Sequence, residues 1–125
     1  MRCCGASGCR SAGGEALLAA LRSAPDADPT QGRTIKPGGC LRLCGRGPLV
    51  ACDGPEGTRL YGAVPAERAA DLLAAVQDGE AAAAALEPHR LDLEHPFFRL
   101  PRPVVLETCG QVDPESIAAA LAHGA

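Results

Sequence analysis

Hydrophobic positions recur at helical spacing in two stretches of the chain. The segment GEALLAALR, residues 14–22, puts Leu17, Leu18 and Leu21 on one face, which predicts an amphipathic helix. A second helix is predicted over residues 65–76, where apolar side chains recur at i, i+3, i+4 and i+7. These side chains are Ala69, Leu72, Leu73 and Val76.

Short apolar runs bounded by turn residues predict strands between and around these helices. Residues 2–4 form the end of a very short strand, residues 33–36 (RTIK) a second, and residues 48–52 (PLVAC) a buried third. The turn DGPEG, residues 53–57, leads into a return strand at residues 58–61, which makes a hairpin. The order of strand, helix, strand, hairpin and helix predicts an α/β fold. Its mixed sheet, flanked by helices, is close in outline to a thioredoxin-like sheet.

The character of the chain changes after this second helix. Residues 79–103 are rich in alanine and proline and indicate a short helix followed by an extended linker. Residues 104–106 are apolar enough for a short strand, and Asp113-Pro114-Glu115 has the composition of a helix start. The predicted organisation is one domain over residues 1–78, the linker, and a strand–helix tail over residues 104–125.

Composition narrows the function classes. The net charge of −3 gives no basic footprint for nucleic acid. No apolar run approaches the roughly 20 residues of a membrane span, and the N-terminus lacks the pattern of a signal peptide. We therefore expect a cytoplasmic protein with no direct membrane insertion. In that compartment, clustered cysteines are more often metal ligands or redox groups than structural disulfides.

Five of the seven cysteines fall into two short segments, MRCCGASGCRSAGG and CLRLCGRGPLV. Cys4 and Cys9 are separated by the small residues GASG, and Cys40 and Cys44 by LRL. Four thiolates on two loops suit a [2Fe–2S] cluster, in which each iron takes two cysteines. The adjoining glycines allow a close approach of the backbone, so that N–H groups can point at sulfur.

The residues alone leave alternatives open. Zinc also accepts four cysteines, although zinc knuckles usually space each pair by two residues. A thioredoxin-type dithiol needs the spacing C-x-x-C, which is absent. Disulfides or free thiols are the third possibility.

Over residues 2–76 the motifs CGASGCRSAG, GCLRLCGRGPLV and LYGAVPAERAADLLAAV are similar to the thioredoxin-like [2Fe–2S] ferredoxin family. That family includes the E subunit of bacterial NADH–quinone oxidoreductase, the 24-kDa type. It also includes the N-terminal modules of flavin-bearing diaphorase subunits in NAD-linked hydrogenases and formate dehydrogenases. The resemblance implies one [2Fe–2S] cluster with Cys4, Cys9, Cys40 and Cys44 as its ligands.

The tail HPFFRLPRPVVLETCGQVDPESIAAAL resembles the segment that begins the flavin subunit of such diaphorases. This implies a flavin- and NADH-binding subunit or domain, and other iron–sulfur subunits, as partners. No FMN or NAD site is expected within this chain. The expected function is electron transfer within an NADH-dependent oxidoreductase, by a component that is not catalytic alone. The competing hypothesis is a non-redox docking module stabilised by zinc in place of the cluster.

The remaining residues of chemical interest have simpler interpretations. Cys3 and Cys52 are expected to be small buried hydrophobes, and Cys109 a turn or interface residue. Tyr61 is expected to fill the sheet. His89, His95 and His123 are expected to be solvated or packing residues, and Arg10, Arg42 and Arg46 to flank the cysteine loops as a basic rim.

Overall fold

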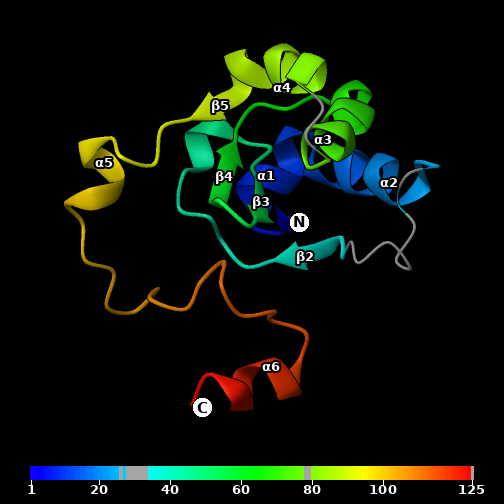
Figure 1. Cartoon of the computed structure of the whole chain (residues 1–125). Coiled ribbons are helices and arrows are strands. Elements are labelled where there is room, and N and C mark those ends of the chain that lie inside the picture. Colours follow the sequence, from blue (N-terminus) through cyan, green and yellow to red (C-terminus); the bar gives the residue numbers. More distant parts are fainter. Residues whose placement is uncertain (26, 28–33, 78–79, 125) are drawn as a thin grey trace.

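A computed structural model describes residues 1–25, 27, 34–77 and 80–124. Its centre is a mixed five-stranded sheet of order β2-β1-β3-β4-β5 (Figure 1). The strands are β1 Arg2–Cys4, β2 Lys36–Gly38, β3 Val50–Gly54, β4 Gly57–Tyr61 and β5 Arg90–Leu91. β1 and β2 run parallel, and every other neighbouring pair is antiparallel. The predicted α/β class with a mixed sheet is therefore confirmed.

The helices of the described residues are short. They are α1 Ser7–Cys9, α2 Glu15–Ser23, α3 Ala69–Ala75, α4 Glu80–Leu86, α5 Pro96–Arg99 and α6 Ile117–Ala122, with a π-helical turn at Arg10–Gly14 and 3-10 turns η3 Cys44–Arg46, η4 Ala66–Arg68 and η5 Glu87–His89. Both predicted helices form. The second begins as η4. The spacing predicts Val76 on the buried face, but α3 ends at Ala75, and Val76 is 37% exposed and lies outside the core.

The main core lies between the sheet and helices α2, α3 and α4, which pack on one another (Figure 1). Its buried members include four leucines at the predicted helical spacing, Leu17, Leu21, Leu72 and Leu73, together with Leu86, Val50, Val64 and Tyr61. Each fully buried leucine stabilises the fold by about 1.5–3 kcal/mol. This core fixes β1 and β3, which carry the cysteine loops at their ends.

The second strand lies later than predicted. Thr34 and Ile35 are outside it, and it runs over Lys36–Gly38 instead. Pro37 has no backbone N–H to donate to a neighbouring strand. Only one neighbour is present among the described strands, because β2 is at the edge of the sheet and pairs with β1 alone. An edge strand tolerates proline because its second side needs no partner. Arg33 and part of the predicted loop over residues 23–32 lie outside the described residues.

The C-terminal part differs most from expectation. The strand predicted at residues 104–106 is wrong: the segment forms bends and turns, with Val104 81% and Val105 92% exposed. The last helix starts later than predicted, at Ile117, because the Ser116 hydroxyl caps it by accepting from the Ala119 N–H at 3.1 Å. Within the expected linker, α4 packs on α3, and β5 pairs with β4.

No helix in the described ranges has both the length and the apolar character needed to cross a membrane.

Candidate metal centre

The first cysteine loop begins at the end of β1 and turns sharply through α1. Cys4 is the last residue of β1 and Cys9 the last of α1, and they are only 4% and 0% exposed. The N–H groups of Cys9 and Arg10 both donate to the Ala6 carbonyl at 3.0 Å. A Cβ at Gly14 would lie 2.7 Å from the Cys9 carbonyl oxygen, so this position requires glycine. The small residues let the chain fold back so that both thiols are held inside the loop.

The second cysteine loop follows β2 and holds its thiols nearer to solvent. Cys40 is half-buried, and Cys44, at the start of η3, is exposed. Arg42 has a φ of +66°, which is uncommon for a residue with a side chain. In this conformation its N–H donates to the Cys40 Sγ at 3.3 Å. The loop thus presents a backbone donor to a candidate ligand sulfur.

The two loops meet through glycine contacts. A Cβ at Gly8 would lie 3.4 Å from the Cys44 Cβ and 3.8 Å from its Sγ. A Cβ at Gly47 would lie 3.2 Å from the Cys9 Sγ. A side chain at Gly8 would make ordinary contact with Cys44, whereas one at Gly47 would press against the Cys9 thiol, so the close packing of the loops depends on Gly47.

All four predicted ligands share one electrostatic neighbourhood. The Cys9 thiol is close enough to Cys4 for a side-chain hydrogen bond, and Cys44 also acts on it electrostatically. The Cys40 thiol is likewise close enough to Cys44 for a side-chain hydrogen bond, and Cys4 also acts on it electrostatically. The thiols are therefore arranged as two pairs, Cys4 with Cys9 and Cys40 with Cys44, and the pairs are near each other. In the described part of the chain, no three His, Cys, Asp or Glu side chains form a group that could hold a metal ion as they stand.

Burial opposes ionisation of the Cys9 and Cys40 thiols. Burial, and then the hydrogen bond with Cys4, raise the pKa of Cys9 to about 11. The Arg42 N–H lowers the pKa of Cys40, but burial and the nearby Cys4 and Cys44 raise it above the ordinary value overall. Metal ligation requires thiolates, so a cation must supply the charge that stabilises them here.

The four cysteines are bordered by apolar side chains toward the protein interior and by exposed residues toward solvent. Leu49 is buried with Cys4 and Cys9, and Ala6, Leu41, Leu43 and Leu91 pack against this cluster. On the outside, Cys44, Gly45 and Arg46 are exposed. Of the expected basic rim, Arg10, Arg42 and Arg46 are all exposed, and Arg10 is paired with Glu15 at 2.5 Å.

The other cysteines lie where the sequence places them. Cys3 and Cys52 are 3% and 4% exposed in the main core, which confirms them as buried small residues. Tyr61, at 4% exposed, is confirmed as a packing residue of the sheet. Cys109 is half-buried in a turn. The His89 Nδ1 lies 3.2 Å from the Gly62 carbonyl oxygen, and the His95 Nδ1 accepts from the Phe97 N–H, so both have local structural partners.

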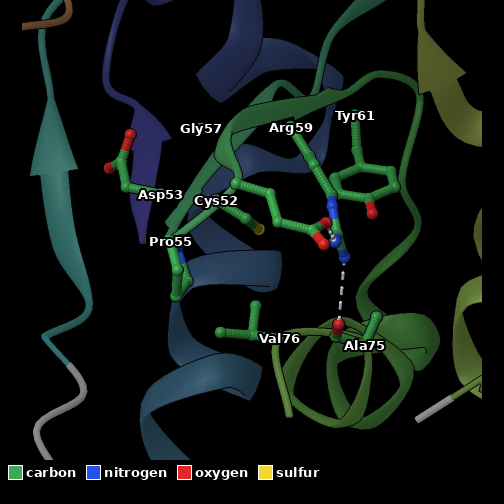
Figure 2. Close-up of a pocket in the computed structure, with 10 residues that line it drawn as sticks. Cys52, Asp53, Pro55, Gly57, Arg59, Tyr61, Ala75 and Val76 are labelled. Carbon is green, nitrogen blue, oxygen red and sulfur yellow. Dashed lines mark hydrogen bonds and ion pairs between the residues drawn. The ribbon is translucent and has the colours of Figure 1, made fainter. Parts of the chain in front are cut away.

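A hollow of about 360 Å³ lies beside the β3–β4 hairpin, at the end of β3 that points away from the cysteine loops (Figure 2). Arg59 crosses it, bonding to Glu56 Oε2 at 2.8 Å and to the Ala75 carbonyl at 3.5 Å. Burial raises the pKa of Cys52, which borders the hollow, to about 12, so this thiol is protonated and unreactive at neutral pH. The hollow offers no nucleophile from Cys52.

Some contacts around the site have no signal in the local sequence pattern. The backbone N–H of Arg42 acts through its positive φ, and Arg2 bonds to Asp53 and to the Gly110 carbonyl. Arg2 and Gly110 are 108 residues apart, so no local pattern could have paired them.

Comparison with known proteins adds no assignment. No family model matches the chain, and no curated protein matches it significantly.

Proposed function

We propose that this chain is an electron-transfer protein with one [2Fe–2S] cluster bound by Cys4, Cys9, Cys40 and Cys44. The observation that carries the proposal is the convergence of four thiols in two pairs, delivered by two loops that are about thirty residues apart in the sequence. A [2Fe–2S] cluster takes two cysteines on each iron, and this donor set fits that requirement. When bound, the cluster would accept and release one electron.

The residues around the thiols support the same function. The Arg42 N–H donates to the Cys40 Sγ, which stabilises negative charge on that sulfur. Leu49 and the apolar side chains packed with it exclude water from the inner thiols. Cys44 lies at the exposed edge, where a redox partner can approach closely without displacing the core.

The topology supports a thioredoxin-like fold as part of this proposal. β1, α2 and the parallel strand β2 are followed by the β3–β4 hairpin and α3, in the sheet order β2-β1-β3-β4. The resemblance in the ligand motifs leads to the same fold.

The partner in this proposal is a flavin- and NADH-binding subunit or domain of a cytoplasmic NADH-dependent oxidoreductase, working with other iron–sulfur subunits. The tail carries exposed apolar side chains that such a partner would cover, namely Phe97, Leu100, Val104, Val105, Ile117 and Leu121. The chain supplies the electron relay, and the partner supplies the flavin and the NADH site.

The decisive experiment is an EPR spectrum of the anaerobically purified, dithionite-reduced protein, with iron, sulfide and zinc assayed on the same sample. We expect a rhombic S = 1/2 signal with about two irons and two sulfides per chain. Replacing Cys9 by alanine should abolish the signal, because it removes one thiolate without offering the oxygen that serine would. Alanine at Cys4, Cys40 or Cys44 should do the same.

The matched control is Cys52→Ala, which removes an equally buried thiol from the main core and should leave the signal intact. The competing function, a docking module stabilised by zinc, predicts an EPR-silent protein with one zinc and no sulfide. That result would refute electron transfer.

A further inference from the structure

The C-terminal tail makes a close backbone contact with the second cysteine loop. A Cβ at Gly39 would lie 3.0 Å from the Gly110 backbone nitrogen and 3.7 Å from the Cys109 Cα. A Cβ at Gly110 would lie 2.7 Å from the Leu41 Cδ2 and 3.4 Å from the Cys40 carbonyl oxygen. At Gly39 the close neighbour is backbone, so little room is left for a side chain there, and at Gly110 the φ of +81° is what favours glycine.

Arg2 fastens this contact to the sheet. Its Nε and Nη2 donate to the two carboxylate oxygens of Asp53 in β3, at 2.9 and 2.6 Å. Its Nη1 donates to the Gly110 carbonyl. One planar guanidinium thus joins β1, β3 and the tail, a geometry that the fork of arginine provides and lysine does not.

The residue whose side chain lies over Gly110, where an added Cβ would meet it, is inside the candidate ligand loop. Leu41 stands between Cys40 and Arg42, whose positive φ aims its N–H at the Cys40 Sγ. Holding Leu41 in place restrains the peptide that supplies this hydrogen bond. Hydrogen bonds to ligand sulfurs stabilise the more negative, reduced state of a cluster and so raise its reduction potential.

We propose that the tail residue Gly110, fastened by Arg2, is a positioning residue that holds the Arg42 N–H on the Cys40 sulfur and thereby raises the reduction potential of the cluster. This inference rests on the proposed function, because it assigns a tuning role at the same four cysteines. It makes the redox property of the loop depend on a segment about seventy residues further along the chain.

The test compares Gly110→Ala with Gly124→Ala in the full-length protein. Both glycines have positive φ, +81° and +89°, but a Cβ at Gly124 meets nothing within 4 Å. Each variant is measured by amide hydrogen exchange over residues 39–42 and by redox titration of the EPR signal. For Gly110→Ala we expect about tenfold faster exchange at the Arg42 amide. We also expect a roughly tenfold lower ratio of reduced to oxidised cluster at fixed potential, which equals about 59 mV for a one-electron couple.

Arg2→Lys provides the second variant, because it keeps the positive charge near the site while losing the fork to Gly110. It should shift exchange and potential in the same direction as Gly110→Ala, and Gly124→Ala should shift neither. Faster exchange with an unchanged potential would reduce the contact to a structural role and overturn the inference, as would unchanged exchange. A protein that binds no iron–sulfur cluster would overturn the proposed function and the tuning together, whereas normal cluster content with an unmoved potential would overturn the tuning alone.

Discussion

Cys3 and Cys4 are neighbours on β1 and enter two different environments. Successive side chains of a strand point to opposite faces, so Cys3 packs with Cys52 and the leucines of the main core, while Cys4 packs with Cys9 and Leu49. Burial does not distinguish the two sets, because it raises the pKa of Cys52 to about 12 and that of Cys9 to about 11. The difference lies in the neighbours: Cys9 lies near Cys4 and also near Cys44 of the other loop, whereas the thiol near Cys52 is that of Cys3, within the main core.

The largest test of this comparison fills the space beside the candidate ligand thiols without replacing a cysteine. In Gly47→Ala the new Cβ would meet the Cys9 Sγ and Cα at 3.2 Å and the Ala12 Cβ at 3.3 Å. Crowding of this kind costs about 1–3 kcal/mol, and here it acts on the pocket that would hold the cluster. We expect the iron content after purification to fall about tenfold or more.

Gly45→Ala is the matched control, because a Cβ at Gly45 meets nothing within 4 Å although it lies in the same loop. It should retain full iron content. Equal iron in the two variants would show that contact between the loops does not shape the site. Circular dichroism on both variants separates cluster loss from unfolding.

The sequence predicts the sheet region well because local patterns and burial agree there. The leucines of residues 14–22 form one buried face of α2, and PLVAC with the DGPEG turn gives the β3–β4 hairpin within two residues of the observed bounds. The cysteine spacing also predicts which thiols lie together. What spacing could not predict is the positive φ of Arg42, because residues with a side chain rarely adopt that conformation.

The second test addresses the core thiols. Folding raises the pKa of Cys52 from 9.0 to about 12, so the folded state holds this proton more tightly than the unfolded state. The resulting stability is fully present below about pH 9 and is lost as the pH rises from 9 toward 12. We expect the thermal midpoint of the wild-type protein to fall across that window.

Cys52→Ala should flatten this alkaline decline, even though it lowers the midpoint at neutral pH by leaving a small cavity. Thermal melts at several pH values measure both effects. An unchanged alkaline slope in the variant would mean that Cys52 does not titrate as a buried core thiol, and the contrast between the core thiols and the candidate ligand thiols would not hold.

The tail shows why the rest could not be predicted. Residues 104–106 are apolar and include the β-branched Val104 and Val105, but strands need a partner, and β2 and β5, the two edges of the sheet, do not pair with them. Asp113 has the right type for a helix cap, yet its Oδ1 accepts from the Glu115 N–H in a local turn, and Ser116 caps the helix instead. Local propensity correctly predicted the last helix, but it wrongly predicted a strand at residues 104–106, where the outcome depends on pairing with another strand.

The smallest test concerns the β1–β3 strand pair, which carries Cys3, Cys4 and Cys52. Burial raises the pKa of Asp53, but hydrogen bonds from Arg2 and Thr58 hold it below its ordinary value of 3.8. The stability from this pair is present above that value and is lost as the pH falls through the folded pKa. Because the Asp53 side chain is 47% exposed, solvent screens the pair and its contribution is below about 1 kcal/mol.

Asp53→Asn should therefore lower the thermal midpoint by about 4 °C at most at neutral pH. The difference from the wild-type protein should disappear in acid, where the wild-type carboxyl is also neutral. Melts of both proteins at neutral pH and at about pH 2 measure this convergence. A difference that persists undiminished in acid would assign the effect to packing of the β1–β3 pair rather than to charge. The strand whose two faces separate Cys3 from Cys4 would then be held by packing and backbone pairing without the ion pair.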